Sequence, residues 1–185
     1  MKLTSIFSGL VATLAASAVA TPLTNLHKRD AAKLGEIVND ISSQVDELTT
    51  TVKGYDGNIF TALKIQIKTS KVGGGLEDGI EETKASQPFT DEESASVAQT
   101  LVGLQPKLTT LADALIEKKD IFKKGILGII PLTGLVKSGL EKQQKLSAEF
   151  GEEVIKKLNK QFADLAPIVN DKIAADLARA IEAFS

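Results

Sequence analysis

The chain has 185 residues, no cysteine and one histidine, and its 22 basic residues nearly balance its 24 acidic ones. This balance, with basic residues spread along the chain, leaves no footprint for nucleic acid, and the lack of cysteine excludes a disulfide framework. A chain of this size forms one domain, which packing of its core must hold together.

The first twenty residues are typical of a secretory signal peptide. Lys2 gives a positive start, a short apolar run follows, and the small residues before Ala20 form a cleavage site. An N-terminal membrane anchor is disfavoured because the apolar run is short and no stop-transfer flank follows it. Residues 21–29 read as a propeptide that ends in the dibasic pair Lys28-Arg29. We therefore expect a signal peptide at 1–20, a propeptide at 21–29 and a functional domain at 30–185.

The expected mature domain is chemically restricted. The removed part carries three basic residues and no acid, so the net charge becomes 19 − 24 = −5. Residues 30–185 contain no His, Cys, Met or Trp, which excludes Ser–His and Cys–His nucleophiles and any metal site that needs imidazole or thiolate. Carboxylate chemistry stays open on composition alone. The acidic clusters at 91–93 and 152–153 fit helix starts and solvated faces better, so we predict no catalytic residue, metal or cofactor.

Helical spacing dominates from the start of this domain. Apolar residues at threes and fours from Leu34 to Tyr55 predict a first helix, and Asp56-Gly57 predicts a turn after it. Ile59, Leu63 and Ile67 continue the helical spacing, although LKIQI also alternates like a strand. A helix is preferred because a lone strand would have no partner. The run Gly73–Gly75 is expected to bend or interrupt this second helix, since each glycine costs about 1 kcal/mol there.

The third predicted helix begins with a capping box at Thr90–Glu93. Pro106 lies inside it and is expected to kink it. Its apolar stripe advances in near-heptad steps through Val97, Leu101, Leu104, Leu108, Leu111, Leu115 and Phe122. This stripe is interpreted first as core, and the same residues would line any ligand channel between the helices.

The segment after this stripe, IFKKGILGIIPLTGLVKSGL at Ile121–Leu140, has an uncharged middle with three glycines and a proline. It is too short and too broken to span a membrane. One reading is a helix that stops at Gly125 or Gly128, a loop, and a new helix with Pro131 at its first position, whose apolar residues cover the end of the core. The other is the mouth of a lipid cavity or an exposed adhesive patch. The two readings are compatible.

Two further apolar stripes complete the chain. One runs from Leu135 to Leu158 and the other from Phe162 to Phe184, where Ala166-Pro167 is expected to kink or divide the helix. The fold prediction is therefore all-α: a single up-and-down bundle of about five amphipathic helices. The end of the chain lacks the apolar tail of a lipid-anchor signal, so a secreted and released product is expected.

Several short motifs occur in an order that resembles a known family. They are DGN at 56–58, Leu104-Gln-Pro106, KKDIFKK at 118–124, and the closing pattern AEF…KL…ADLAP…AADLARAIEAFS. Together with the signal peptide and dibasic site, they make residues 30–185 resemble the hydrophobic surface-binding protein A family of filamentous fungi, also called the cell wall mannoprotein 1 family. Two departures are the Gly73–Gly75 run and the absence of a Ser/Thr-rich tail, which weakens the case for covalent wall attachment.

The resemblance implies a small secreted or wall-associated helical protein without enzymatic activity. Some members adsorb to hydrophobic solids and recruit hydrolases there, and others hold fatty acids between their helices. For this chain we expect a long-chain lipid or a hydrophobic surface as partner, with Lys123 and Lys124 as candidate carboxylate partners. The alternative is a structural wall or adhesion protein with a filled core. The expected apolar lining is Leu101, Leu104, Leu108, Phe122, Ile126, Ile129, Leu132, Leu135 and Phe150.

Overall fold

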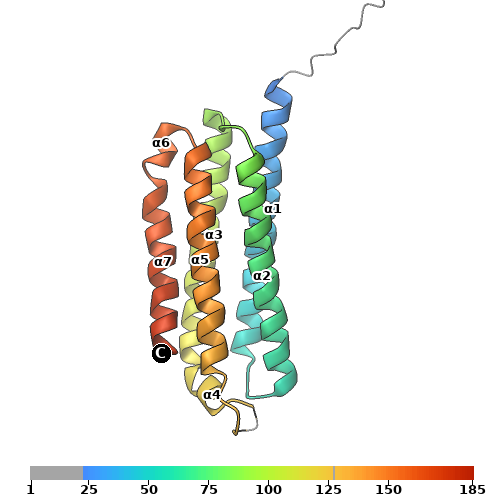
Figure 1. The fold of residues 1–185 in the computed structure, drawn as a ribbon, viewed down its shortest axis with the longest axis vertical. Coiled ribbons are helices and arrows are strands. Elements are labelled where there is room, and N and C mark those ends of the chain that lie inside the picture. Colours follow the sequence, from blue (N-terminus) through green and yellow to red (C-terminus); the bar gives the residue numbers. More distant parts are fainter. Residues whose placement is uncertain (1–22, 127) are drawn as a thin grey trace, which may run out of the picture.

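The computed structural model describes residues 23–126 and 128–185, with side chains from residue 30 onward. The five long helices and two short ones are α1 (Leu23–Lys53), α2 (Ile59–Ala85), α3 (Asp91–Glu117), α4 (Lys119–Lys124), α5 (Thr133–Lys157), α6 (Lys160–Ala163) and α7 (Ala166–Ala183) (Figure 1). Within the described ranges the only β-type pairing is an isolated bridge between Ile126 and Ile130. The predicted bundle of about five helices is confirmed.

One predicted processing site lies before α1 and the other lies inside it. Ala20 lies outside the described residues, and Lys28-Arg29 falls within the second turn of α1. Cleavage at either place stays a prediction. The same holds for the division into residues 1–20, 21–29 and 30–185.

The long helices form a ring in which each packs chiefly against two others. The order around the ring is α1, α2, α5, α7, α3 and back to α1. Successive long helices alternate in direction, as Figure 1 shows. Neighbours in the ring are nevertheless not always neighbours in sequence, so α1 and α3 run parallel. Cross-links between exposed side chains follow this arrangement: Lys68 pairs with Glu47 across α1 and α2, and Lys107 pairs with Asp46 across α1 and α3.

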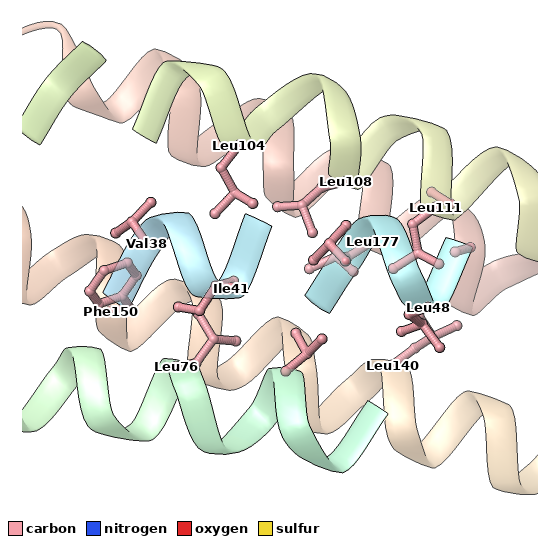
Figure 2. Packing of buried hydrophobic residues seen from close by; sticks show 14 of the residues in the cluster. Val38, Ile41, Leu48, Leu76, Leu104, Leu108, Leu111, Leu140, Phe150 and Leu177 are labelled. Carbon is pink, nitrogen blue, oxygen red and sulfur yellow. The ribbon is translucent and has the colours of Figure 1, made fainter. Parts of the chain in front are cut away.

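A ring of five helices has a physical consequence for the interior. Packed helices lie 8–10 Å apart, so the centre of a five-membered ring is roughly 8 Å from each axis, compared with about 6 Å in a four-helix bundle. Side chains of ordinary length must reach further to meet at the centre. The core side chains come from all five long helices (Figure 2), and their ring leaves room for a central space.

The predicted interruption of the second helix is wrong. α2 continues without a break through Gly73–Gly75. A Cβ atom on Gly75 would lie 2.8 Å from the Ile41 side chain of α1, and one on Gly79 would lie 2.9 Å from the Phe150 ring of α5. These glycines therefore allow two neighbouring helices to approach α2 closely, and tertiary packing offsets their low helix propensity.

The apolar face that the sequence predicts for α2 is also wrong. Ile59, Leu63 and Ile67 have the spacing of a buried stripe, but all three are exposed. The buried residues of α2 are instead Ile65, Val72, Gly73, Leu76, Gly79, Ile80 and Thr83. The helical interpretation is right, but two apolar stripes lie on this helix and the sequence does not say which one faces inward.

The predicted helix starts and breaks are largely confirmed. Asn58 caps α2 through Phe60 N, and Thr90 and Glu93 make the reciprocal hydrogen bonds of a capping box at α3. α3 continues as one helix across Pro106. The predicted division near Pro167 appears as the break between α6 and α7.

The two ends of the bundle are built differently. At the end that carries α6, here the α6 end, backbone bonds tie the α2–α3 connection to α5: Phe89 N donates to Lys157 O at 2.7 Å. At the opposite end, here the α4 end, the contacts are aromatic. Tyr55 stacks on Phe122 with ring centroids 4.6 Å apart, and Phe122 meets Phe184 edge-on at 5.7 Å. The α6 end is closed by hydrogen bonds and the α4 end by apolar packing.

Hydrogen bonds of a buried carboxylate connect α7 to α3. Asp176 of α7 is the only acidic residue among those described that is buried. It accepts hydrogen bonds from Thr109 at 2.5 Å and Gln105 at 3.3 Å, and from Arg179 at 3.2 Å. Because leaving one buried member unpaired is costly, this network fixes how α7 sits against α3.

Candidate functional site

The ring encloses a cavity of about 410 Å³ that is lined by all five long helices and by Phe122 of α4. Figure 2 shows Leu104, Leu108 and Leu111 of α3 pointing into the interior, with Leu76 of α2 opposite Leu104 and Leu140 of α5 opposite Leu111. The lining on α3 extends from Ala95 to Leu115, which is about 30 Å of helix at 1.5 Å per residue. The cavity is therefore long in the direction of the bundle axis.

The wall of this cavity is almost entirely apolar. Among the described residues that line it, none is charged. Its polar side chains are Gln66, Thr69, Gln99, Gln143, Ser147 and Asn170. Such a wall favours an apolar chain, because an unpaired charge inside it would pay a large desolvation penalty.

Lining residues that are also exposed fall into two groups, from which we infer two openings. One lies between α2 and α5 toward the α4 end, where Gln66 and Leu135 are exposed; we call it the α2–α5 mouth. The other extends from the middle of α3 toward the α6 end, where Gln99 and Val102 of α3 and Leu165 before α7 are exposed. A linear ligand can thus lie inside with one end near water.

Most of the predicted lining is found at the cavity wall. Seven of the nine predicted residues line it: Leu101, Leu104, Leu108, Phe122, Leu132, Leu135 and Phe150. Ile126 and Ile129 do not line it; Ile126 is half-buried, and Ile129 is exposed. Lys123 and Lys124 are exposed at the end of α4 and lie outside the wall as well.

Sequence reasoning missed the contributions of α2 and α7. Ile65, Val72 and Leu76 line the cavity from α2, and Ile173 and Leu177 line it from α7. The α7 residues are visible in the sequence as an apolar stripe, but nothing in that stripe separates a ligand wall from a filled core. The α2 residues are missed because the spacing favours the other stripe as the inner face.

The segment between α4 and α5 takes the predicted helix–turn–helix form. α4 ends at Lys124 and Gly125 follows with φ +67°; a Cβ atom there would overlap Ile130 O, so only glycine fits. α5 begins at Thr133, two residues later than the start predicted at Pro131. Leu132 lines the cavity, whereas Ile130 is 58% exposed. This segment, here the hinge (residues 125–126 and 128–132), therefore faces both the cavity and the solvent.

The described residues have two further properties. No helix among them is both long and apolar enough to cross a membrane. They also contain no group of three or more His, Cys, Asp or Glu side chains arranged to hold a metal ion.

Two curated relatives are cell wall mannoprotein 1 of Aspergillus fumigatus and of Talaromyces marneffei. Each is 26% identical to this chain, over 96% and 93% of its length. The match spans 60% of the first relative and 37% of the second, so both contain more than this chain does.

Solved structures share the fold. The chain is similar to AFMP4P in complex with palmitic acid, with a TM-score of 0.80 at 22% identity over 84% of this chain and 99% of the other. It is also similar to ligand binding domain 1 of the Penicillium marneffei MP1 protein complexed with arachidonic acids, with a TM-score of 0.74 at 23% identity over 85% and 99% of the two chains.

The family assignment rests on a direct match. Residues 31–156, well over half of the chain, match the family described as hydrophobic surface binding protein A. This match covers α2, α3, α4 and most of α1 and α5, and therefore much of the cavity wall. The chain belongs to the hydrophobic surface binding protein A family.

Proposed function

We propose that this chain is a secreted, non-enzymatic protein that holds a long-chain lipid in its central cavity. The observation that carries the proposal is the elongated cavity of about 410 Å³ with no charged residue in its described wall. Ligand pockets commonly measure about 300–1,000 Å³, whereas packed interiors rarely keep voids larger than a water molecule. A cavity of this size argues against the alternative of a structural protein with a filled core.

The energetics suit reversible binding. Each buried methylene contributes about 0.8 kcal/mol, so an enclosed sixteen-carbon chain gains about 13 kcal/mol. Lost freedom on association costs at least about 4 kcal/mol, which leaves at most about 9 kcal/mol and allows an affinity up to the micromolar to submicromolar range. Proteins of the same fold that hold palmitic or arachidonic acid support this ligand class.

The head group of an ionised fatty acid belongs outside the wall. Because none of the described lining residues carries a positive charge, the carboxylate is better placed in water at a mouth than inside. At the α2–α5 mouth it would lie at the same end of the bundle as Lys123 and Lys124, our proposed carboxylate partners. A secreted or wall-associated location is supported by the curated wall relatives, and recruitment of hydrolases stays a prediction.

A titration tests the cavity directly. The purified, delipidated chain is titrated with a fluorescent fatty acid, beside Ala98→Phe and Ala32→Phe. Ala98 lines the cavity, whereas Ala32 is exposed on α1 and does not. If the new ring displaces two methylenes of the ligand, binding by Ala98→Phe weakens by about 1.6 kcal/mol, or about 15-fold. Ala32→Phe should bind like the wild type, and no saturable binding by the wild type would refute the proposal.

A second candidate function is adsorption to hydrophobic solids, as the family description suggests. A separate observation favours it: Ile59, Phe60 and Leu63 of α2 and Ile129 and Ile130 of the hinge are exposed at the α4 end. Exposed apolar residues that cluster usually mark a contact site. Adsorption to polystyrene or wax particles, measured beside Ile129→Glu, tests this function. Unchanged adsorption by a folded Ile129→Glu would exclude the hinge from it.

A further inference from the structure

The α4 end combines two features that occur together nowhere else among the described residues. The first is an exposed apolar group, here the α4-end patch, in which Phe60 is 72% exposed and Ile129 is 78% exposed. The second is a set of lysines on the same end of the bundle. The patch consists of Ile59, Phe60, Leu63, Ile129, Ile130 and Leu135.

The members of the patch come from segments that meet in space. Gly57, in the turn before α2, lies against the hinge: a Cβ atom there would be 3.6 Å from Gly125 O. Leu135 lines the α2–α5 mouth together with Ala62 and Gln66. Figure 1 shows the hinge, α4 and the α1–α2 turn together at one end of the ring. The patch therefore adjoins an entrance to the cavity.

Seven lysines occupy this end: Lys53, Lys64, Lys118, Lys119, Lys123, Lys124 and Lys137. Within the described part of the chain, none of them forms an ion pair, although eight other basic residues do. The acids at this end are Asp56, Glu117, Asp120 and, in the last turn of α7 next to Phe184, Glu182, and Asp56 accepts a hydrogen bond from Asn58 N. This end is thus positive in a domain that is negative overall.

The α6 end provides the contrast. It also exposes apolar side chains, with Ile168 at 67%, but acidic residues accompany them. Asp91 and Glu92 begin α3 and Asp164 precedes α7. Nearby lysines are paired with acids: Lys84 with Glu149 and Lys156 with Glu153. Apolar exposure alone therefore does not distinguish the two ends; the sign of the charge around it does.

We propose that the α4 end docks on an anionic lipid bilayer, which places the α2–α5 mouth against the membrane. The patch enters the interfacial region while the lysines meet anionic head groups, and this pairing of two weak signals is what stable peripheral binding requires. A lipid chain can then pass between bilayer and cavity without crossing water. The interaction goes beyond lipid binding in the cavity and beyond adsorption to an uncharged solid.

The test compares vesicles of phosphatidylcholine alone with vesicles that also contain phosphatidylglycerol, by flotation of the purified chain. Binding should be clear on the mixed vesicles, weak on the neutral ones, and reduced by salt. Each lysine near an anionic surface is worth about fivefold in affinity, so Lys123→Gln/Lys124→Gln should bind mixed vesicles about 25-fold more weakly. Lys145→Gln/Lys160→Gln, exposed positions away from this end, should bind like the wild type.

The apolar part is tested by Ile129→Asp at the α4 end and Ile168→Asp at the α6 end. Only the first should weaken flotation, and both should keep the wild-type circular dichroism because both positions are exposed. Equal binding to the two vesicle types, or equal loss in the two aspartate variants, overturns the docking proposal. Titration of a soluble fluorescent fatty acid without vesicles separates this outcome from the cavity: a chain that binds the probe but not vesicles keeps the proposed function and loses the docking surface.

Discussion

The glycine run in α2 offers a matched pair of substitutions at adjacent positions. A Cβ atom on Gly74 would meet nothing within 4 Å, whereas one on Gly75 would lie 2.8 Å from Cγ1 and 3.6 Å from Cδ1 of Ile41. Ile41 is 1% exposed, and its branched side chain has few alternative rotamers. Both glycines lie inside a helix, so backbone propensity favours alanine equally at both.

The two variants should therefore change the free energy of unfolding in different directions. Gly74→Ala gains about 0.5–1 kcal/mol because alanine loses less backbone entropy than glycine. Gly75→Ala gains the same amount but incurs about 1–3 kcal/mol of overpacking against Ile41. Its net effect lies between neutral and a loss of about 2 kcal/mol, and the two variants should differ by about 1–3 kcal/mol.

Thermal unfolding followed by circular dichroism measures this difference. For a chain of 150–250 residues, 1 kcal/mol corresponds to about 2–4 °C in Tm, so Gly74→Ala should melt above the wild type and clearly above Gly75→Ala. If Gly75→Ala were stabilised as much as Gly74→Ala, α1 would not approach α2 as closely as described. Double substitution with Ile41→Ala provides a control, because alanine removes the Cγ1 atom that a Cβ at position 75 would meet. In that background Gly75→Ala should no longer be destabilising.

Three further predictions concern the ligand, the acid stability and a helix cap. Fatty alcohols and fatty acids of equal chain length should bind with affinities within a few-fold of each other, while each added methylene should improve the affinity about fourfold until the cavity is full. Displacement titrations over a series of chain lengths measure both effects. An affinity that depends more on the head group than on chain length would contradict this prediction. Burial raises the pKa of the Asp176 carboxyl, but hydrogen bonds from Thr109 and Arg179 and the nearby positive charges outweigh this effect, so the pKa is lowered overall. The ionised carboxylate therefore stabilises the fold above its unfolded pKa of about 3.9. This contribution is lost as pH falls through the lower pKa of the folded state. Asp176→Asn should therefore flatten the acid limb of a stability-versus-pH curve, unlike the exposed Asp171→Asn. Thr90→Ala should cost about 1 kcal/mol in urea unfolding because it removes the cap of α3, and an unchanged midpoint would mean that the cap is dispensable.

Much of the fold was predictable because strong local signals agree with the tertiary structure. The capping box at Thr90 and the turn at Gly57 both appear where the sequence places them. The leucine stripe of α3 is buried as expected, with Leu104 at 4% exposure. In these segments only one face of the helix is apolar, so periodicity also gives the direction of the core.

The sequence-based predictions fail where the apolar periodicity is ambiguous, or where packing against another helix determines which face is buried. α2 carries two apolar stripes, one through Leu63 and one through Ile65, and the choice between them depends on where α1 and α5 lie. Periodicity alone favours the stripe of Leu63, which is exposed, over that of Ile65, which is buried. From sequence alone the glycine run is typical of a helix break. Its role is seen only in the structure, where Ile41 packs against Gly75 and Phe150 packs against Gly79. The cavity was predictable only through a resemblance, because the same leucines line a filled core and a channel alike.

The order of the helices around the ring affects how the cavity forms as the chain folds. α7 is the last helix in the chain, and it fills the position between α3 and α5. Until residues 166–183 are synthesised, the other four long helices can form only an open trough whose apolar floor faces water. The buried Asp176 pairs with residues 67 and 71 positions earlier in the chain, and Arg179 pairs with Asp113 of α3. Polar contacts therefore accompany the apolar packing where α7 docks on α3. A chain that lacks a docked α7 therefore exposes the apolar lining along the side of the bundle, between α3 and α5.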